Sequence, residues 1–243
     1  MLDGPRAAVG FLTRVPIPIG QVVMGQAAPW FPVVGILIGG FQAAVWVAGR
    51  TVLDPLPAAV LATAAAALLT GAFHHDGLAD VADAFGGGWD VEQRMAILKD
   101  SRLGTYGTTA LILAFATEVS TVASLDTASG ARALVAAHAL SRAVAVATMR
   151  VAPLAGDGMG AAYAADLRLA GTLAAMAVGL TTTVVALWDP VAVVAAVGLS
   201  LLAAGLMVTL AKRKIGGVTG DVLGAVQVLA ALAVLVAAAA TMV

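Results

Sequence analysis

The chain has 243 residues, of which 61% are hydrophobic and only 11% are charged. A soluble domain carries roughly 25% charged residues, so this composition excludes an ordinary water-exposed surface and predicts an integral membrane protein. The net charge of −1 argues against nucleic-acid binding, because phosphate contacts need clustered Lys and Arg. No cysteine is present, which excludes disulfides and thiolate metal sites.

Seven apolar stretches approach the length of about 20 residues that a helix needs to cross a bilayer. Many are rich in Ala and Gly, which let helix backbones pack closely. The stretches are Phe31–Gly49, Leu56–Phe73, Tyr106–Ser124, Ala133–Val151, Ala170–Leu187, Val191–Ala211 and Val222–Val243. We therefore predict an all-α, polytopic bundle of about seven transmembrane helices, forming a single membrane-embedded domain over residues 1–243.

The positions of Lys and Arg predict the orientation, since cytoplasmic segments are enriched in both. With a cytoplasmic N-terminus, only Arg50 and Arg132 fall outside, and Arg142 lies within a span. The cytoplasmic segments then hold Arg6, Arg14, Arg94, Lys99, Arg102, Arg150, Arg168, Lys212, Arg213 and Lys214. This asymmetry predicts that the N-terminus is cytoplasmic.

The longest cytoplasmic segment is His74–Thr105, and loops of that length are usually functional or structured. We expect its first part to continue the second helix until Gly86-Gly87-Gly88 ends it. Val91–Ser101 is then predicted to be a short amphipathic helix, with Val91, Met95 and Leu98 on one face, and Gly104 is expected to stop it.

Three acids in this segment, Asp76, Asp80 and Asp83, recur at helical spacing. These positions lie within about 60° of one another on one helical face. Three carboxylates so close would repel one another unless a cation lies between them, and oxygen ligands favour Mg²⁺ or Mn²⁺. The alternative is a solvated helical face just outside the bilayer. His74 could be an ordinary interfacial histidine.

Two further polar runs fall on the same predicted side. Lys99–Gly107 joins two cations, an acid, hydroxyls and glycines, which suits phosphate oxygens, although a positive anchor with a helix stop would look alike. Gly216–Asp221 places glycines before a helix N-terminus, where an anion can bind; Asp221 as a plain N-cap is the alternative.

Three ionisable residues, Glu118, His138 and Arg142, fall inside predicted spans, where such groups are costly and usually face the bundle interior. For Glu118 and Arg142 we favour a structural pair over a catalytic role. Clustered carboxylates, basic residues and Gly-rich turns together suit phosphoryl transfer aided by a divalent metal. Residue chemistry alone therefore leads to a metal-dependent phosphotransferase at a membrane surface, with no substrate named.

The chain also resembles the cobalamin synthase family, the adenosylcobinamide-GDP ribazoletransferases. Four pieces carry the resemblance in order: Phe11–Pro18, Phe31–Gly35, Phe73–Asp83 with Lys99–Gly107, and Gly216–Ala225. His75 stands where an apolar residue is expected, and His74 matches the family histidine. Family members often have acids in the helix that follows Asp221, where this chain has Val228 and Ala231, so no acid after Asp221 is assigned a role.

The resemblance implies a reaction in which a hydroxyl of α-ribazole, or of its 5′-phosphate, attacks the cobinamide-linked phosphate of adenosylcobinamide-GDP. GMP leaves, and adenosylcobalamin or its 5′-phosphate forms, with Mg²⁺ as cofactor. The expected location is the bacterial inner membrane, with the active site on its cytoplasmic face, and self-association into a homo-oligomer is left open.

Role assignments follow as hypotheses. Asp76, Asp80 and Asp83 bind Mg²⁺, and Asp221 completes the metal site or orients a ligand. Asp100 or His74 takes the proton from the attacking hydroxyl, a choice that the sequence leaves open. The substrate-binding candidates are Arg14, Lys99, Ser101, Arg102 and Thr219.

Two alternatives compete with this interpretation. A CDP-alcohol phosphotransferase also uses an Asp-rich helix, but its signature has Ala-Arg where Ala79 is followed here by Asp80. An ion-coupled transporter could also place acids among many helices. Transporters usually hold them near the bilayer midplane in paired halves, and no halves are visible in this sequence.

Overall fold

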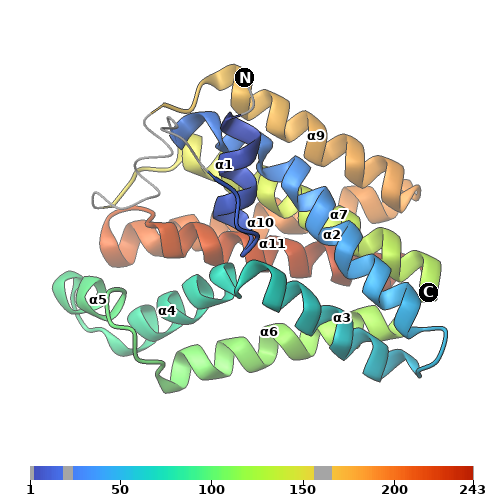
Figure 1. The fold of residues 1–243 in the computed structure, drawn as a ribbon. Helices are drawn as coiled ribbons and strands as arrows, with labels where there is room; N and C mark the ends of the chain where they lie inside the picture. Colours follow the sequence, from blue (N-terminus) through green and yellow to red (C-terminus); the bar gives the residue numbers. More distant parts are fainter. Residues whose placement is uncertain (1–2, 19–23, 156–165, 243) are drawn as a thin grey trace.

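The computed structural model describes residues 3–18, 24–155 and 166–242, and these ranges fold into α-helices with two short 3₁₀ turns (Figure 1). The helices are α1 (Asp3–Leu12), α2 (Phe31–Gly49), α3 (Pro55–Thr70), α4 (Phe73–Gly87), α5 (Val91–Ile97), α6 (Thr105–Ser124), α7 (Thr127–Val151), α9 (Leu169–Leu187), α10 (Pro190–Ile215) and α11 (Gly220–Thr241). The prediction of an all-α bundle is confirmed.

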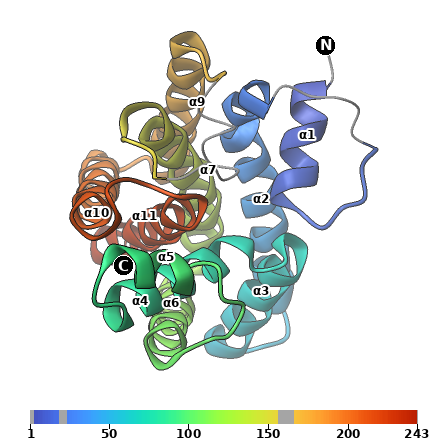
Figure 2. The ribbon, with the colours of Figure 1, turned by 90° about the vertical axis from the view of Figure 1, so that its left-hand side faces the viewer.

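Six helices of the described chain are long and apolar enough to cross a membrane, namely α2, α6, α7, α9, α10 and α11. A seventh span arises if α3 and α4, which meet at an angle of 90°, are counted as one broken span. The expected number of about seven therefore agrees with the structure. We call the end of the bundle where α4 finishes and α6 and α11 begin the polar end; it faces the viewer in Figure 2.

The central helix of the bundle is α7, which packs against α2, α9 and α11. Most of α7 and α11 is buried inside the protein, whereas α6, α9 and α10 lie at the periphery. Figure 1 shows α9 and α6 at opposite edges of the bundle. Peripheral side chains such as Leu180, Val185 and Leu206 point outward, as a lipid-facing surface requires.

Small residues on α2 explain its close packing on α7. A Cβ atom on Gly35 would lie 2.4 Å from the carbonyl oxygen of His138, and one on Gly39 would lie 2.8 Å from Cα of Val135. Spacing two glycines four residues apart lets two helix backbones touch within a membrane. The Gly-rich composition of the spans is therefore used for helix packing.

The prediction that the second helix runs on without a break into the His74–Thr105 segment is wrong. Helix α3 ends at Thr70, because Gly71 and Ala72 both adopt the left-handed conformation, with φ of 65° and 54°. The backbone N–H of Arg14 donates to the carbonyl oxygen of Leu69 over 2.8 Å, and the Arg14 side chain packs over Gly71. The bend turns α4 so that it lies against both α6 and α11.

Replacing Gly71 with Ala should lower the free energy of unfolding by at least about 1–2 kcal/mol, because a Cβ atom is unfavourable in left-handed backbone. The added atom would also lie 2.1 Å from Nε of Arg14. Titration of the purified protein with a denaturing detergent measures the effect. Gly205→Ala is the control, since no described residue lies within 4 Å of its added Cβ; equal stability of the two variants would contradict the prediction.

The positions of the other helix ends at the polar end agree only in part with those predicted from the sequence. Helix α4 ends at Gly87, within the predicted Gly-rich stop. Helix α5 ends at Ile97, earlier than predicted, and Met95 packs on the core while Val91 is exposed. Gly104 does not end α5 but is the N-cap of α6, because the six intervening residues, Leu98–Leu103, form no helix.

Candidate active site

Four carboxylates gather at the polar end, and we call Asp76, Asp80, Asp83 and Asp221 the acidic cluster. The first three belong to α4 and the last to the first turn of α11. The charge of Asp80 is repelled by those of the other three, so all four share one neighbourhood. Two runs that lie more than a hundred residues apart in the sequence are therefore brought together.

Close contact between α4 and α11 brings Asp221 to the other acids. A Cβ atom on Gly77 would lie 2.9 Å from the carbonyl oxygen of Asp221. The turn before α11 is also held in place, since the backbone N–H of Val218 donates to Pro153 O over 2.8 Å and Ala155 N–H donates to Val218 O over 2.9 Å. The position of Asp221 thus depends on both α4 and the segment after α7.

The carboxylate of Asp83 anchors the start of α6. Its Oδ2 accepts a hydrogen bond from Gly104 N–H at 2.7 Å, and its Oδ1 accepts one from Gly107 N–H at 2.9 Å. A carboxylate is favourable at a helix N-terminus, where backbone N–H groups lack partners. Asp83 therefore has a structural role that its neighbours Asp76 and Asp80 do not share, since neither makes a hydrogen bond of this kind in the described residues.

Asp83→Asn should lower the free energy of unfolding by about 1–3 kcal/mol, because an amide offers one acceptor where two N–H groups need partners. Asp80→Asn should instead leave the stability of the metal-free protein unchanged or raise it, since it removes repulsion within the acidic cluster. Detergent-denaturation midpoints recorded in EDTA compare the two. A larger loss for Asp80→Asn would contradict both expectations.

The acidic cluster fits a hard divalent cation by donor type, since it offers carboxylate oxygens and mutual repulsion that a cation would relieve. In the part of the chain that the structure describes, no three or more His, Asp or Glu side chains are arranged so that they could hold a metal ion. Part of the reason is that Asp83 turns its oxygens to α6. The magnesium site thus stays a prediction.

The basic run between α5 and α6 lies on the surface. Lys99, Ser101 and Arg102 are exposed, and Arg102 is ion-paired with Asp100, with 2.5 Å between Nη2 and Oδ2. Hydrogen bonds from Arg102 lower the pKa of Asp100 to about 2. A carboxylate with so low a pKa is a weak general base, which argues against Asp100 as the proton acceptor.

Two substrate-binding candidates have local roles. Thr219 is the N-cap of α11, where its hydroxyl oxygen accepts from Val222 N–H over 3.3 Å and its O–H donates to Oδ2 of Asp221 over 3.3 Å. Asp221 is thus not itself the cap. Arg14 is exposed and covers the bend between α3 and α4, near the start of the helix that bears the acids.

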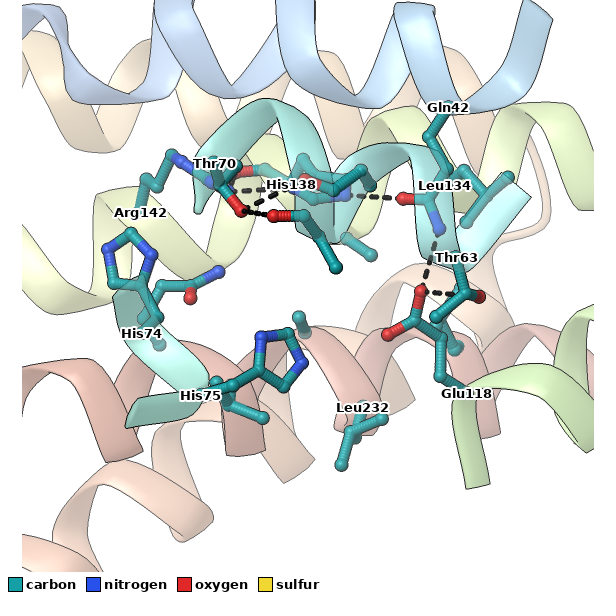
Figure 3. Close-up of a pocket in the computed structure, with 17 residues that line it drawn as sticks. Gln42, Thr63, Thr70, His74, His75, Glu118, Leu134, His138, Arg142 and Leu232 are labelled. Carbon is teal, nitrogen blue, oxygen red and sulfur yellow. Dashed lines mark hydrogen bonds between the residues drawn. The ribbon is translucent and has the colours of Figure 1, made fainter. Parts of the chain in front are cut away.

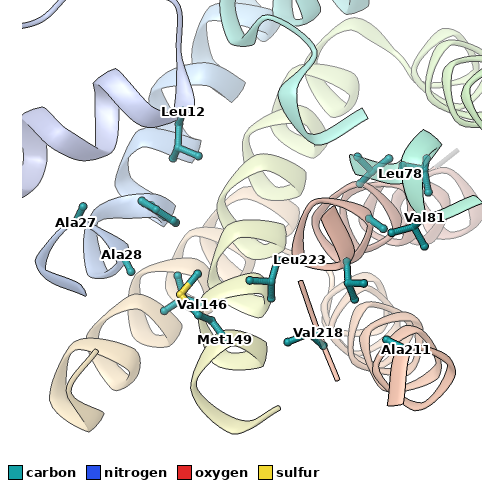
Figure 4. Packing of buried hydrophobic residues seen from close by; sticks show 14 of the residues in the cluster. Leu12, Ala27, Ala28, Leu78, Val81, Val146, Met149, Ala211, Val218 and Leu223 are labelled. Carbon is teal, nitrogen blue, oxygen red and sulfur yellow. The ribbon is translucent and has the colours of Figure 1, made fainter. Parts of the chain in front are cut away.

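Two cavities meet beside the acidic cluster. The outer chamber is lined by aromatic rings and by Asp221, with about 610 Å³ between its atoms including its open mouth. The inner chamber lies deeper and is lined by polar side chains, Glu118 among them (Figure 3). His74, Arg142 and Gln227 line both chambers. Buried apolar side chains of α1, α4, α7 and α11 pack around this end (Figure 4).

The predicted direct pairing of Glu118 with Arg142 is wrong, because two side chains stand between them (Figure 3). Gln42 Nε2 donates to Oε1 of Glu118 over 2.7 Å, and Gln42 Oε1 lies 2.6 Å from Nε2 of His138. His138 Nδ1 lies 2.8 Å from Nη1 of Arg142. Thr63 also donates to Glu118. Gln42, Thr63 and Gln227 were not among the predicted site residues, although polar side chains within apolar spans are a usable signal.

Comparison with known proteins decides the family. The family model described as cobalamin-5-phosphate synthase matches residues 4–239. The chain belongs to the cobalamin-5-phosphate synthase family. The resemblance seen in the sequence is thereby confirmed. Members of this family are transferases in cobalamin synthesis, so the chain is an enzyme.

Curated relatives extend over nearly the whole chain. Adenosylcobinamide-GDP ribazoletransferases from Sinorhizobium medicae and Bradyrhizobium diazoefficiens are each 41% identical, covering 96% and 97% of this chain and 94% and 92% of their own. The enzyme of the same name from Ralstonia nicotianae is 39% identical over 90% of this chain and 88% of its own. No solved structure matches.

Proposed function

We propose that this enzyme joins α-ribazole, or its 5′-phosphate, to adenosylcobinamide-GDP and releases GMP. The family and the names of the relatives support this reaction. The single structural observation that carries it is the acidic cluster beside the outer chamber, because Asp221 belongs to both. Carboxylates at the edge of a cavity suit transfer between a diphosphate and a bound alcohol.

The residues would act as follows. His74, which lines both chambers, accepts the proton of the attacking hydroxyl. The oxygen of that hydroxyl forms a bond to the cobinamide-linked phosphorus, and the bond from this phosphorus to the oxygen of GMP breaks. Lys99, Ser101 and Arg102, which are exposed on the segment that leads to Gly104 and its hydrogen bond with Asp83, would bind phosphate oxygens of the diphosphate and of the departing GMP.

Magnesium belongs to the proposal as the cofactor. Asp76, Asp80 and Asp221 would hold it once their side chains turn toward one another, since no three acids of the described chain are arranged to do so as they stand. Asp83 would contribute the lone pairs that its hydrogen bonds to α6 leave over. When bound, the cation would neutralise the diphosphate charge. Arg14 and Thr219, which lie next to the bend and to Asp221, complete the proposed binding surface.

The proposed location is the inner membrane, with the polar end in the cytoplasm. The segments assigned to the cytoplasm carry most of the basic residues. Two of these residues connect helices at the polar end, since Arg94 Nη1 donates to Lys214 O over 3.1 Å and Lys214 Nζ donates to Phe85 O over 3.2 Å. Formation of a homo-oligomer remains a prediction.

The test is incubation of the purified protein in detergent with adenosylcobinamide-GDP, α-ribazole or its 5′-phosphate, and Mg²⁺. Mass measurement should detect the joined product and equimolar GMP, and EDTA should abolish both until Mg²⁺ is restored in excess. Release of CMP from a CDP-alcohol would favour the related phosphotransferases instead. Absence of any product with every donor would refute the proposal, and product formed without an ion gradient would exclude pure transport.

A further inference from the structure

Among the described residues, Arg142 is a buried cation without a carboxylate partner. Its side chain is 1% exposed, and its hydrogen bonds to described residues run only from Nη1, to Nδ1 of His138 at 2.8 Å and to His138 O at 3.1 Å. Nε is buried and has no partner in the part of the chain that the structure describes. A buried, unpaired charge is strongly unfavourable, so this position needs an anion that the described protein residues do not supply.

A series of hydrogen-bonded side chains behind Arg142, namely His138, Gln42 and Glu118, fixes the orientation of its guanidinium. Because a guanidinium can only donate, Nδ1 of His138 accepts, and Nε2 carries the hydrogen that it donates to Gln42 Oε1. Gln42 in turn donates to Glu118. Nη1 of Arg142 is therefore occupied by these hydrogen bonds, and the free edge of the guanidinium is the one formed by Nε and Nη2. That edge presents two parallel N–H donors, which match two oxygens of a phosphate.

The outer chamber in front of Arg142 has an aromatic wall. The rings of Phe11 and Phe31 stack with centroids 5.5 Å apart, and Phe73 meets Phe11 edge-on at 5.1 Å. All three rings line the same chamber as Arg142 and Asp221. Aromatic walls favour planar aromatic ligands. The chamber thus suits a ligand that combines a planar ring system with a phosphate.

We propose that the outer chamber binds the acceptor nucleotide and that Arg142 recognises its 5′-phosphate, which makes Arg142 a specificity-determining residue. The inference rests on the proposed function. The benzimidazole base lies against Phe11, Phe31 and Phe73, the phosphate lies on the Nε–Nη2 edge of Arg142, and the reacting hydroxyl faces the side of Asp221. The carboxylate of Asp221 would repel the phosphate, which enforces this orientation.

Calorimetric titration in detergent, with no corrinoid or Mg²⁺ present, tests the proposal. The wild-type protein should bind α-ribazole 5′-phosphate about 10- to 100-fold more tightly than α-ribazole, as charge-assisted hydrogen bonds would give. Arg142→Gln should remove this preference while α-ribazole still binds, and Arg142→Lys should retain part of it. Arg150→Gln, which removes an exposed cation of the same helix, should keep the full preference.

Several outcomes would overturn the proposal. Equal affinities in the wild-type protein would do so without any variant, which matters if Arg142→Gln fails to fold. An unchanged preference in a folded Arg142→Gln protein, or loss of the preference when phosphatidylglycerol is added, would assign the phosphate site elsewhere or to a lipid headgroup. Product formation in the transfer assay alongside equal affinities would refute this inference alone, whereas failure of all acceptor binding and all transfer would refute the proposed function.

Discussion

Asp80→Ala should reduce ribazole transfer by about 1,000-fold or more while the protein remains inserted and folded. Asp80 is the acid that feels the charge of the other three members of the acidic cluster, so it lies where a shared cation would be held. Its side chain makes no structural hydrogen bond in the described residues, unlike that of Asp83. Transfer is measured as GMP release over a wide range of Mg²⁺ concentrations.

The matched control for Asp80→Ala is Glu92→Gln. Glu92 is an exposed acid on α5 at the same end of the bundle, and its loss changes the net charge equally. The control should keep nearly all activity. Near-normal transfer by Asp80→Ala at saturating Mg²⁺, or an equal loss in both variants, would remove Asp80 from the proposed metal site.

The parts of the fold that were predictable from sequence depend on local patterns. The length of the apolar stretches predicted the membrane spans, and helical periodicity predicted that Asp76 and Asp80 lie on one face of α4. The choice of Gly86–Gly88 as a stop was correct because glycine favours helix ends. The left-handed conformation of Ala72 has no such signal, since alanine is the best helix former, and the bend at α4 was missed for that reason.

The missed parts of the site depend on contacts between distant segments. Asp83 has the same helical spacing as its neighbours, but its oxygens are taken by Gly104 and Gly107, which no local pattern reveals. His75 stands at a position where the family resemblance led us to expect an apolar residue. Its ring stacks on Phe115 with centroids 4.5 Å apart, so it packs as an aromatic residue would.

His74→Gln should lower kcat for ribazole transfer by about 10²- to 10⁴-fold, the range that loss of a general base produces. His74 lines both chambers together with Arg142 and Gln227, and its ring meets that of Phe73 edge-on at 5.2 Å. Asp100, the other candidate base, is ion-paired with Arg102 at the surface. Steady-state kinetics with saturating Mg²⁺ and both substrates gives kcat.

Two controls separate proton acceptance by His74 from general damage to the polar end. His75→Gln changes the adjacent ring, which packs on Phe115, and should cost less than about tenfold. Asp100→Asn should also have a small effect, because hydrogen bonds from Arg102 already lower the pKa of Asp100 to about 2. The carboxylate is therefore fully ionised from pH 5 to pH 9, and no step in the pH–rate profile in that range can be assigned to it. A fall for Asp100→Asn as large as that for His74→Gln would transfer the role of base to Asp100, and equal falls for the two histidines would leave neither with a specific role.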